Sequence, residues 1–150
     1  AIGLVNPLTV SRSATDALKK GWLRKSDTIC MNSEHLLATA KHKVLELSEA
    51  GYKPPKYRED LSLPGMTLRT MASVGLKAMK AQGKISDHDE LVASKTAFVL
   101  SGGDKGGLMS KVDEQYVLDI EREAFMSLAG EEKTQQRIAH FLKTGKPLRN

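Results

Sequence analysis

A glycine-rich stretch, "SGGDKGGLMS" at residues 101–110, has the composition of a phosphate-binding loop. Backbone N–H groups of such a loop bind phosphate when the loop follows a strand and opens a helix. The spacing fits neither common pattern: Leu108 follows Gly107 where a P-loop needs Lys, and Gly103 directly follows Gly102 where a dinucleotide fingerprint needs another residue between them. We therefore interpret residues 101–110 as a flexible connection between two helices.

The four histidines and one acidic cluster are the other candidates for metal or acid–base chemistry. His35 and His42 are seven residues apart, whereas a zinc-binding helix needs a spacing of four, and His88 and His140 have no carboxylate or cysteine at ligand spacing. The cluster "SDHDE" at 86–90 has the residue types of a cation site. Successive helical residues point in different directions, so this cluster fits the acidic start of a helix better. We assign no catalytic residue and no metal ligand, and cofactor-binding residues are unknown.

The segments around these candidates have apolar residues at helical spacing and residues that commonly cap or end helices. Ser86 and the acidic residues after it predict a helix that includes "KTAFVL" at 95–100, so the glycine-rich stretch follows a helix and not a strand. Ser13, Ser33 and Asp113 are the other predicted N-caps. The predicted helices span 13–20, 33–51, 66–82, 86–100, 113–130 and 131–145. An all-α fold follows, with about five helices besides the short one at 13–20.

Apolar residues recur at three and four positions in these helices, as expected for faces that pack together. The predicted stripes are Leu36, Leu37, Ala40, Val44 and Leu47; Met71, Val74, Ala78 and Met79; Val117, Ile120, Ala124 and Leu128; and Ile138, Phe141 and Leu142.

The connections suggest one unit with a single linker candidate. A chain of 150 residues fits one domain, so we expect 1–150 to form a single helical domain or fragment. Residues 52–65, "YKPPKYREDLSLPG", contain three prolines and predict an extended surface connection. The apolar opening "AIGLVNPLTV", which Pro7 interrupts, is expected to lie in a core.

Composition limits the classes of partner and compartment. The net charge of +5 and the pI near 9.3 are compatible with an anionic partner, but the basic residues are scattered, and seven aromatic residues are few for a surface that binds single-stranded nucleic acid. No apolar run approaches the roughly 18 residues of a transmembrane helix. The single cysteine, Cys30, excludes an internal disulfide and indicates a reducing, cytoplasmic setting.

Five segments together resemble one enzyme family. The chain is similar, over nearly its whole length, to the C-terminal part of the bacterial 3-hydroxyacyl-CoA dehydrogenases that carry a fused enoyl-CoA hydratase (crotonase) region. These segments are "GWLRKSDTICMNSEHLLATAK" at 21–41, "AGYKPP" at 50–55, "GKISDHDELVASKTAFVLSGGD" at 83–104, "DEQYVLDIEREAF" at 113–125 and the run at 118–150. "SRSATDALKKGWL" at 11–23 resembles a late crotonase turn, with "GLVN" at 3–6 as the alternative match.

The resemblance implies a role in fatty-acid β-oxidation as part of a larger enzyme. Such an enzyme adds water to an enoyl thioester by general acid–base catalysis and then transfers hydride from the 3-hydroxyl carbon to NAD. This chain has no NAD fingerprint, no placeable His and Glu pair of the dehydrogenase, and no crotonase glutamates. It is expected to supply structural helices and part of the acyl-CoA pocket or oligomer interface, to bind no cofactor itself, and to be inactive in isolation. Its expected partners are the rest of the enzyme, acyl-CoA and further copies in a homo-oligomer, without nucleic acid.

Two other function classes stay open. A self-standing basic helical module would bind nucleic acid or an acidic protein, with salt-dependent retention on DNA. A nucleotide-binding enzyme built on 101–110 would show protection of Lys105 from acylation by ATP.

Overall fold

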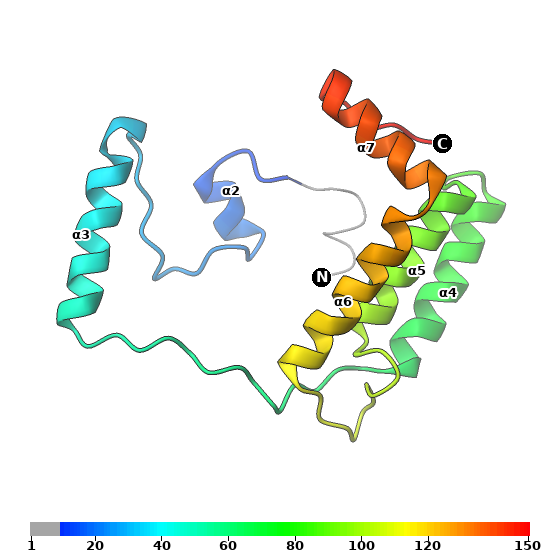
Figure 1. Ribbon diagram of the computed structural model, residues 1–150, viewed down its shortest axis with the longest axis horizontal. Coiled ribbons are helices and arrows are strands. Elements are labelled where there is room, and N and C mark those ends of the chain that lie inside the picture. Colours follow the sequence, from blue (N-terminus) through cyan, green and yellow to red (C-terminus); the bar gives the residue numbers. More distant parts are fainter. Residues whose placement is uncertain (1–9) are drawn as a thin grey trace. The chain divides into compact units, whose positions relative to one another are not determined.

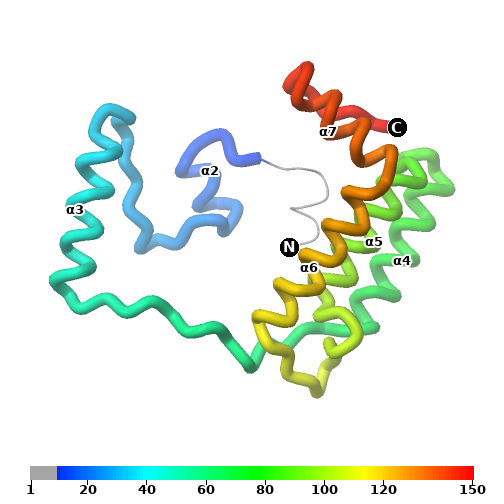
Figure 2. Tube along the Cα trace, viewed as in Figure 1, coloured from blue at the N-terminus to red at the C-terminus, as the bar shows by residue number. Residues whose placement is uncertain are grey.

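The computed structural model describes residues 10–150, and within that range the chain is all-helical (Figures 1 and 2). Six α-helices and one short 3₁₀-helix are present there, which confirms the predicted all-α class. The expectation of a core position for the opening stretch, and the alternative match at 3–6, fall outside the described residues except for Val10. The described chain divides into two compact units, residues 10–56 and 57–150. Whether they form one domain stays a prediction.

The first unit, residues 10–56, begins with α2 (Ala14–Lys19). The Ser13 hydroxyl accepts a hydrogen bond from the Asp16 N–H at 3.1 Å, as the predicted cap requires, and Gly21 ends the helix with φ 75°. The Asp16 carboxylate accepts from the Arg12 N–H at 3.0 Å and from Lys20 Nζ at 2.7 Å. The Lys20 hydrogen bond, together with the one from Arg12, lowers the pKa of Asp16.

The second helix of this unit starts differently from the prediction. Ser33 does not cap it, because Ser33 lies inside the 3₁₀-helix η1 (Ser33–His35) that precedes α3 (Leu36–Glu49). The cap of η1 is Asn32, whose side chain accepts from the Glu34 N–H at 3.0 Å, and the N-cap residue of α3 itself is His35, without a side-chain hydrogen bond. A tight first turn thus moves the cap one residue earlier.

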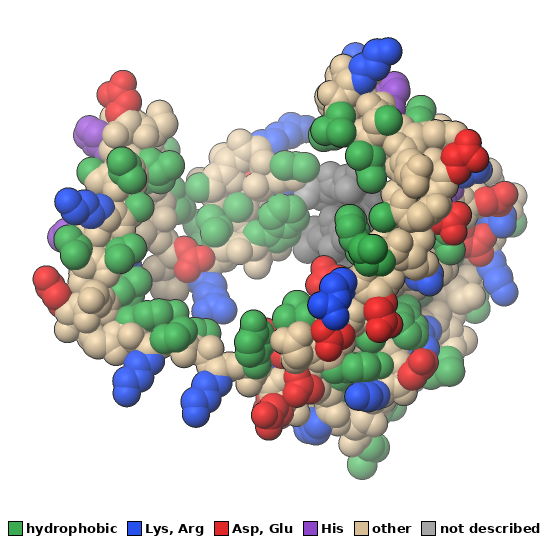
Figure 3. All heavy atoms as spheres, viewed as in Figure 1, with side chains coloured by type: hydrophobic (Ala, Val, Ile, Leu, Met, Phe, Trp, Pro, Cys, Tyr) green, Lys and Arg blue, Asp and Glu red, His purple; other side chains and the backbone are tan. Residues whose placement is uncertain are grey.

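Within residues 10–56, no layer covers the predicted apolar stripe of α3. Hydrophobic side chains lie open along this helix (Figure 3), and Leu37 is 82% exposed. A shallow hollow beside it is lined by Val44, Leu47, Ser48 and Tyr52. Of the described hydrophobic residues in 10–56, Ala17 alone is buried.

The second unit, residues 57–150, contains a layer of three helices with α5 in the middle (Figure 1). The layer comprises α4 (Met66–Ala81), α5 (Asp87–Leu100) and α6 (Glu114–Ala129), and α7 (Glu132–Thr144) contacts α6 beyond the Gly130 cap. The buried hydrophobic residues here are Ala93, Ala97, Val112 and Ile120. The small side chains of Ala93 and Ala97 allow close approach at the centre of the layer.

The predicted stripes have different outcomes in this unit. In α6 the stripe packs inward as predicted, with Ile120 buried and the other members half-buried. In α4 the stripe faces outward, because Met71 and Val74 are 69% and 65% exposed, and the half-buried apolar residues are Leu68, Ala72 and Leu76. Residues in both sets recur at helical spacing, so spacing alone did not distinguish the two sides of α4.

The connection at 52–65 is extended and is exposed through Asp60, as predicted, but Leu61, Leu63 and Pro64 are half-buried and Gly65 is buried. Leu61 pairs with the buried Val112 in an antiparallel bridge, with N···O distances of 3.0 and 2.9 Å. The Gly65 N–H donates to the Ser101 carbonyl at 3.0 Å. Backbone hydrogen bonds to the α5–α6 loop therefore fix this part of the connection.

Gly65 and Gly106 allow these two segments to touch. Gly65 has φ 60°, and a Cβ there would lie 2.7 Å from backbone atoms of Gly106 and Gly107. A residue with a side chain would need both an unfavourable backbone conformation and a displaced loop.

No helix in residues 10–150 combines the length and the apolar composition that crossing a membrane requires.

Candidate functional site

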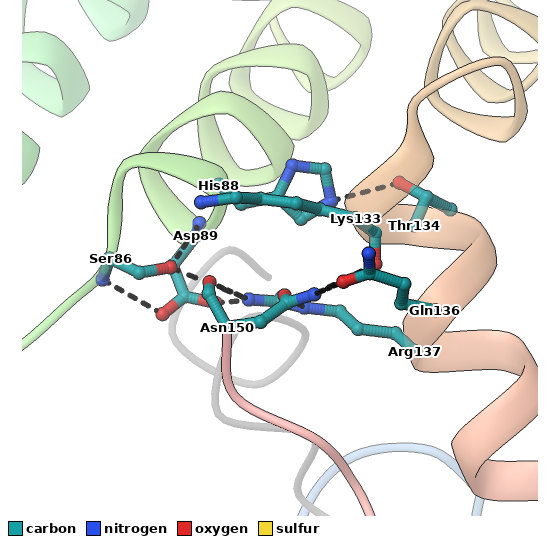
Figure 4. A network of polar contacts seen from close by, with 8 residues as sticks. All are labelled: Ser86, His88, Asp89, Lys133, Thr134, Gln136, Arg137 and Asn150. Atoms are coloured by element: carbon teal, nitrogen blue, oxygen red, sulfur yellow. Dashed lines mark hydrogen bonds and ion pairs between the residues drawn. The ribbon is translucent and has the colours of Figure 1, made fainter.

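The most extensive polar network in the second unit joins the first turn of α5 to α7 (Figure 4). Ser86 and Asp89 form a capping box, in which the Ser86 hydroxyl accepts from the Asp89 N–H and the Asp89 carboxylate accepts from the Ser86 N–H. Arg137 of α7 donates from Nη1 to Asp89 Oδ1 at 2.8 Å. The helix start predicted at Ser86 is therefore confirmed and is also tied to another helix.

The charge of Asp89 is stabilised in this network. Burial opposes ionisation of its carboxyl group, but the Ser86 N–H and the Arg137 guanidinium both donate to it and lower its pKa below the ordinary value. About a quarter of each side chain of the Asp89–Arg137 pair is exposed, so water screens the pair only in part.

His88 lies beside this ion pair and is 4% exposed. Its Nε2 and the Thr134 hydroxyl are 2.9 Å apart and share a hydrogen bond. Burial, and then the charges of Arg137 and Lys133, lower the pKa of His88. Neutral imidazole is therefore favoured at this position.

Asn150 brings the segment after α7 back onto that helix (Figures 2 and 4). Its side-chain oxygen accepts from Arg137 Nε at 2.8 Å, and its side-chain nitrogen donates to Gln136 Oε1 at 2.9 Å and to the Lys133 carbonyl at 3.3 Å. The main-chain oxygen of Asn150 accepts from Arg137 Nη2 at 3.2 Å. Arg137 therefore bridges α5, α7 and the final residues.

This network has the chemistry of a structural junction. The Ser86 hydroxyl and the Asp89 carboxylate are used in hydrogen bonds at the start of α5 and to α7, and the Thr134 hydroxyl that contacts His88 joins α7 to α5. The positions of the four histidines agree with this interpretation: His35 precedes α3, His42 lies on α3, His88 on α5 and His140 on α7.

The acidic cluster at 86–90 also has partners among the described residues. Lys80 of α4 lies 2.8 Å from both Asp87 and Glu90 of α5. Its hydrogen bonds to Asp87 and then to Glu90 raise the pKa of Lys80, and the Lys80 contact lowers the pKa of Asp87. These acids therefore connect two helices.

The glycine-rich loop joins α5 to α6, as predicted, but its beginning is not a flexible connection at the surface. Ser101, Gly102 and Gly103 are buried. The N–H groups of Gly102, Gly103 and Gly106 donate to backbone carbonyls of this same region at 2.8–2.9 Å. Because these three N–H groups already donate to backbone carbonyls, they do not form a phosphate cradle.

The two charged residues of the loop also have partners. Asp104 accepts from Arg69 Nη1 at 3.1 Å, and Arg69 lies over the Phe98 ring at 5.4 Å. Lys105 Nζ lies 4.2 Å from the centroid of the Tyr116 ring. Both side chains therefore hold the loop against neighbouring helices.

Sequence reasoning did not identify Arg137, Thr134 or Asn150. Arg137 is 48 residues from Asp89, and no local spacing rule connects them. A single Arg on the polar side of an amphipathic helix ordinarily faces solvent, so the sequence contained no signal for this contact.

The fold and this junction define a helical segment with structural polar contacts. The comparisons with known proteins identify a related enzyme. A Bacillus subtilis (strain 168) protein described as "Probable 3-hydroxyacyl-CoA dehydrogenase" is 45% identical over 141 residues. These residues are 94% of this chain and only 18% of that protein, so the chain spans less than a fifth of the curated relative it matches. No protein-family model matches the chain, and no solved structure matches it.

The comparison supports the dehydrogenase part of the resemblance seen in the sequence. The name of the relative contains no enoyl-CoA hydratase, so the fused crotonase region has no support from it.

Proposed function

We propose that this chain is the C-terminal segment of a fatty-acid β-oxidation enzyme that oxidises 3-hydroxyacyl-CoA with NAD. The observation that carries the proposal is the 45% identity, which extends over 94% of the chain but covers a small part of a 3-hydroxyacyl-CoA dehydrogenase. Enoyl-CoA hydration by the same enzyme rests on the sequence resemblance alone. The single cysteine supports a reducing, cytoplasmic setting.

Within this enzyme, the segment supplies structural helices rather than catalytic groups. The middle helix α5 supports this role because apolar residues lie on several of its sides, although α4 and α6 are the helices packed along it and α7 contacts only its first turn. Its Leu91, Val92, Phe98, Val99 and Leu100 are only half-buried. A helix that is apolar all round belongs in the interior of a larger protein.

Open apolar side chains on α7 support the same role. Ile138, Phe141 and Leu142 are 46%, 55% and 79% exposed and lie on one face of the helix. We propose that the rest of the enzyme, or a second copy in a homo-oligomer, covers such faces. The segment also forms part of the acyl-CoA pocket in this proposal, where basic side chains would suit the CoA phosphates.

Capture of the native protein tests this proposal. An antibody against this chain should capture, from source-cell lysate, a protein several times heavier than 16.4 kDa. The captured protein should oxidise 3-hydroxyacyl-CoA with NAD and hydrate crotonyl-CoA. Dehydrogenase activity without hydratase activity would contradict only the part of the proposal that concerns enoyl-CoA hydration. A band at 16.4 kDa with neither activity would contradict the proposal.

A pair of variants of the captured enzyme tests the structural role. Leu142→Asp places a charge on the open apolar face of α7, whereas Lys143→Asp changes the adjacent exposed residue. If the face is covered in the whole enzyme, the first variant should lower the yield of folded enzyme and the second should not. Equal yields of the two variants would mean that this face is open to solvent.

A basic binding module is the second candidate, and the distribution of charge favours it. Residues 1–56 contain nine Lys and Arg against five Asp and Glu, which places +4 of the total +5 in that part. Salt-dependent retention of the captured protein on DNA, together with the absence of both activities, would support this alternative.

A further inference from the structure

The contacts that hold α7 against the first turn of α5 are mainly polar. His88 meets Thr134 at 2.9 Å, and Asp89 meets Arg137 at 2.8 Å (Figure 4). The large apolar residues of α7 contribute little burial, because Ile138, Phe141 and Leu142 are about half exposed or more. The position of α7 over α5 therefore depends on the charge states of these polar groups.

His88 is the member of this network whose ordinary pKa is nearest neutrality. The residue is 4% exposed, so a proton added to its ring has little access to water. The ring also lies in the first turn of α5, where the positive end of the helix dipole disfavours a cation.

The charged groups around His88 come from three elements. Arg137 and Lys133 of α7 oppose protonation, whereas Asp89 of α5 and Glu131 of the α6–α7 turn favour it. Asp89 already pairs with Arg137 and accepts a hydrogen bond from the Ser86 N–H, so these two partners largely compensate its charge. Burial and the two cations therefore outweigh the two acids.

We infer that the His88–Thr134 contact is an acid-sensitive latch: protonation of His88 releases α7 and the following residues from α5, while the α4–α5–α6 layer stays folded. Release exposes the imidazolium to water and separates it from Lys133 and Arg137. The layer has its own buried residues, Ala93, Ala97 and Ile120, so its packing does not require α7. The latch belongs to residues 86–150 and does not depend on the proposed enzymatic role.

The pH range follows from the direction of the pKa change. The pKa of His88 is lower when α7 is docked on α5 (closed) than when α7 is released (open), so the closed state has its full stability above the ordinary histidine pKa of about 6.5. This stability is lost as pH falls below that value. One pH unit below that value, the closed-to-open ratio of α7 should fall by roughly threefold to tenfold.

Hydrogen exchange of the full chain, read by mass spectrometry, tests the latch. Peptides from α7 are compared with peptides from α4 at about pH 7.5 and about pH 5.5, with exposure times scaled to the intrinsic exchange rate at each pH. In the wild type, the exchange protection of α7 should fall by roughly threefold to tenfold between the two pH values, and that of α4 should change by less than about twofold. An unchanged α7, or equal losses in the two helices, would overturn the inference.

Two variants identify the responsible group. His88→Gln keeps a side chain that can hydrogen bond to Thr134 but does not titrate, so its α7 protection should vary by less than about twofold over this range. His140→Gln removes another histidine of α7, outside the network, and should retain the wild-type response. A wild-type response in His88→Gln would contradict the role of His88.

If α7 does not dock in the His88→Gln variant at neutral pH, a measurement on the wild-type protein still tests the latch. Nuclear magnetic resonance of the wild-type imidazole protons reports the titration of His88, and exchange reports the opening of α7. The two should change over the same pH range. Opening of α7 at a pH where His88 remains neutral would overturn the latch.

Discussion

Asp89 and Arg137 lie 48 residues apart in the chain, yet Asp89 Oδ1 and Arg137 Nη1 are 2.8 Å apart. This ion pair joins the capping box of α5 to α7 and leaves about a quarter of each side chain exposed. Partial burial gives the pair a larger role than an ordinary surface ion pair, because water screens it less.

Removal of Arg137 should therefore destabilise the second unit. Arg137→Met keeps the aliphatic part of the side chain but leaves Asp89 without its cation, so the free energy of unfolding should fall by about 1–2 kcal/mol. Urea denaturation followed by circular dichroism measures this change. The control is Arg122→Met, which breaks a largely exposed pair with Asp119 and should cost less than about 0.5 kcal/mol. Equal losses of unfolding free energy in the two variants would show that the Asp89–Arg137 pair contributes no more to stability than an exposed ion pair.

Asp89 should make the stability of the chain sensitive to strong acid. Its pKa is lower when folded than when unfolded, so its contribution is complete above the unfolded value of 3.8 and is lost as pH falls through the folded value. In Asp89→Asn, stability should be lower at neutral pH and should depend less on pH below about 4. Denaturation across this range measures the difference. Asp104→Asn, which removes an 83% exposed carboxylate, is the control and should lower stability at neutral pH by less than Asp89→Asn does.

Gly65→Ala should be severely destabilising. The new Cβ would meet the backbone of Gly106 and Gly107, and Ala would also have to adopt φ 60°, so a loss of about 3 kcal/mol or more is expected. Gly75→Ala is the matched control, because Gly75 lies inside α4 with open space around its Cβ position. That variant should gain roughly 0.5–1 kcal/mol from helix propensity. Thermal unfolding of both variants measures the contrast, and a mild effect at Gly65 would contradict the close contact between the two loops.

Two neighbouring residues of α6 should differ strongly in their contribution to stability. Ile120 is 5% exposed, so Ile120→Ala should cost about 2–4 kcal/mol through lost burial and a cavity. Leu118 is 40% exposed, so Leu118→Ala should cost about 1 kcal/mol or less. Chemical denaturation of the isolated chain measures both. If Leu118→Ala were the costlier variant, the assignment of the inner face of α6 would be wrong.

Local rules predicted the helix boundaries well, because caps and glycines act over a few residues. Ser13, Ser86 and Asp113 each cap a helix in the structure, and Gly51 and Gly145 end helices with positive φ. The prediction failed at Ser33 because a 3₁₀ turn precedes α3 and places the cap at Asn32. A difference of one residue in the first turn leaves no clear mark in the residue pattern.

Which face of a helix is buried was harder to predict. In α6 the predicted stripe packs inward, whereas Leu118, Phe125 and Met126 on other sides of the helix are exposed. α4 carries apolar residues on more than one side, and the side with Leu68 and Leu76 faces α5 while Met71 faces out. Hydrophobic periodicity shows that faces exist, but the choice between them depends on neighbours.

The sequence by itself determined the helical class, most helix ends and the likeness to part of a dehydrogenase, because these depend on local backbone preferences and on residue identity in order. Tertiary structure alone decided the junction of Asp89, His88, Arg137 and Asn150 and the close contact of Gly65 with Gly106. Both bring together residues that are tens of positions apart or lie on separate elements. Hydrogen bonds and steric contacts act over a few ångströms in space, so such partners have no fixed spacing in the chain.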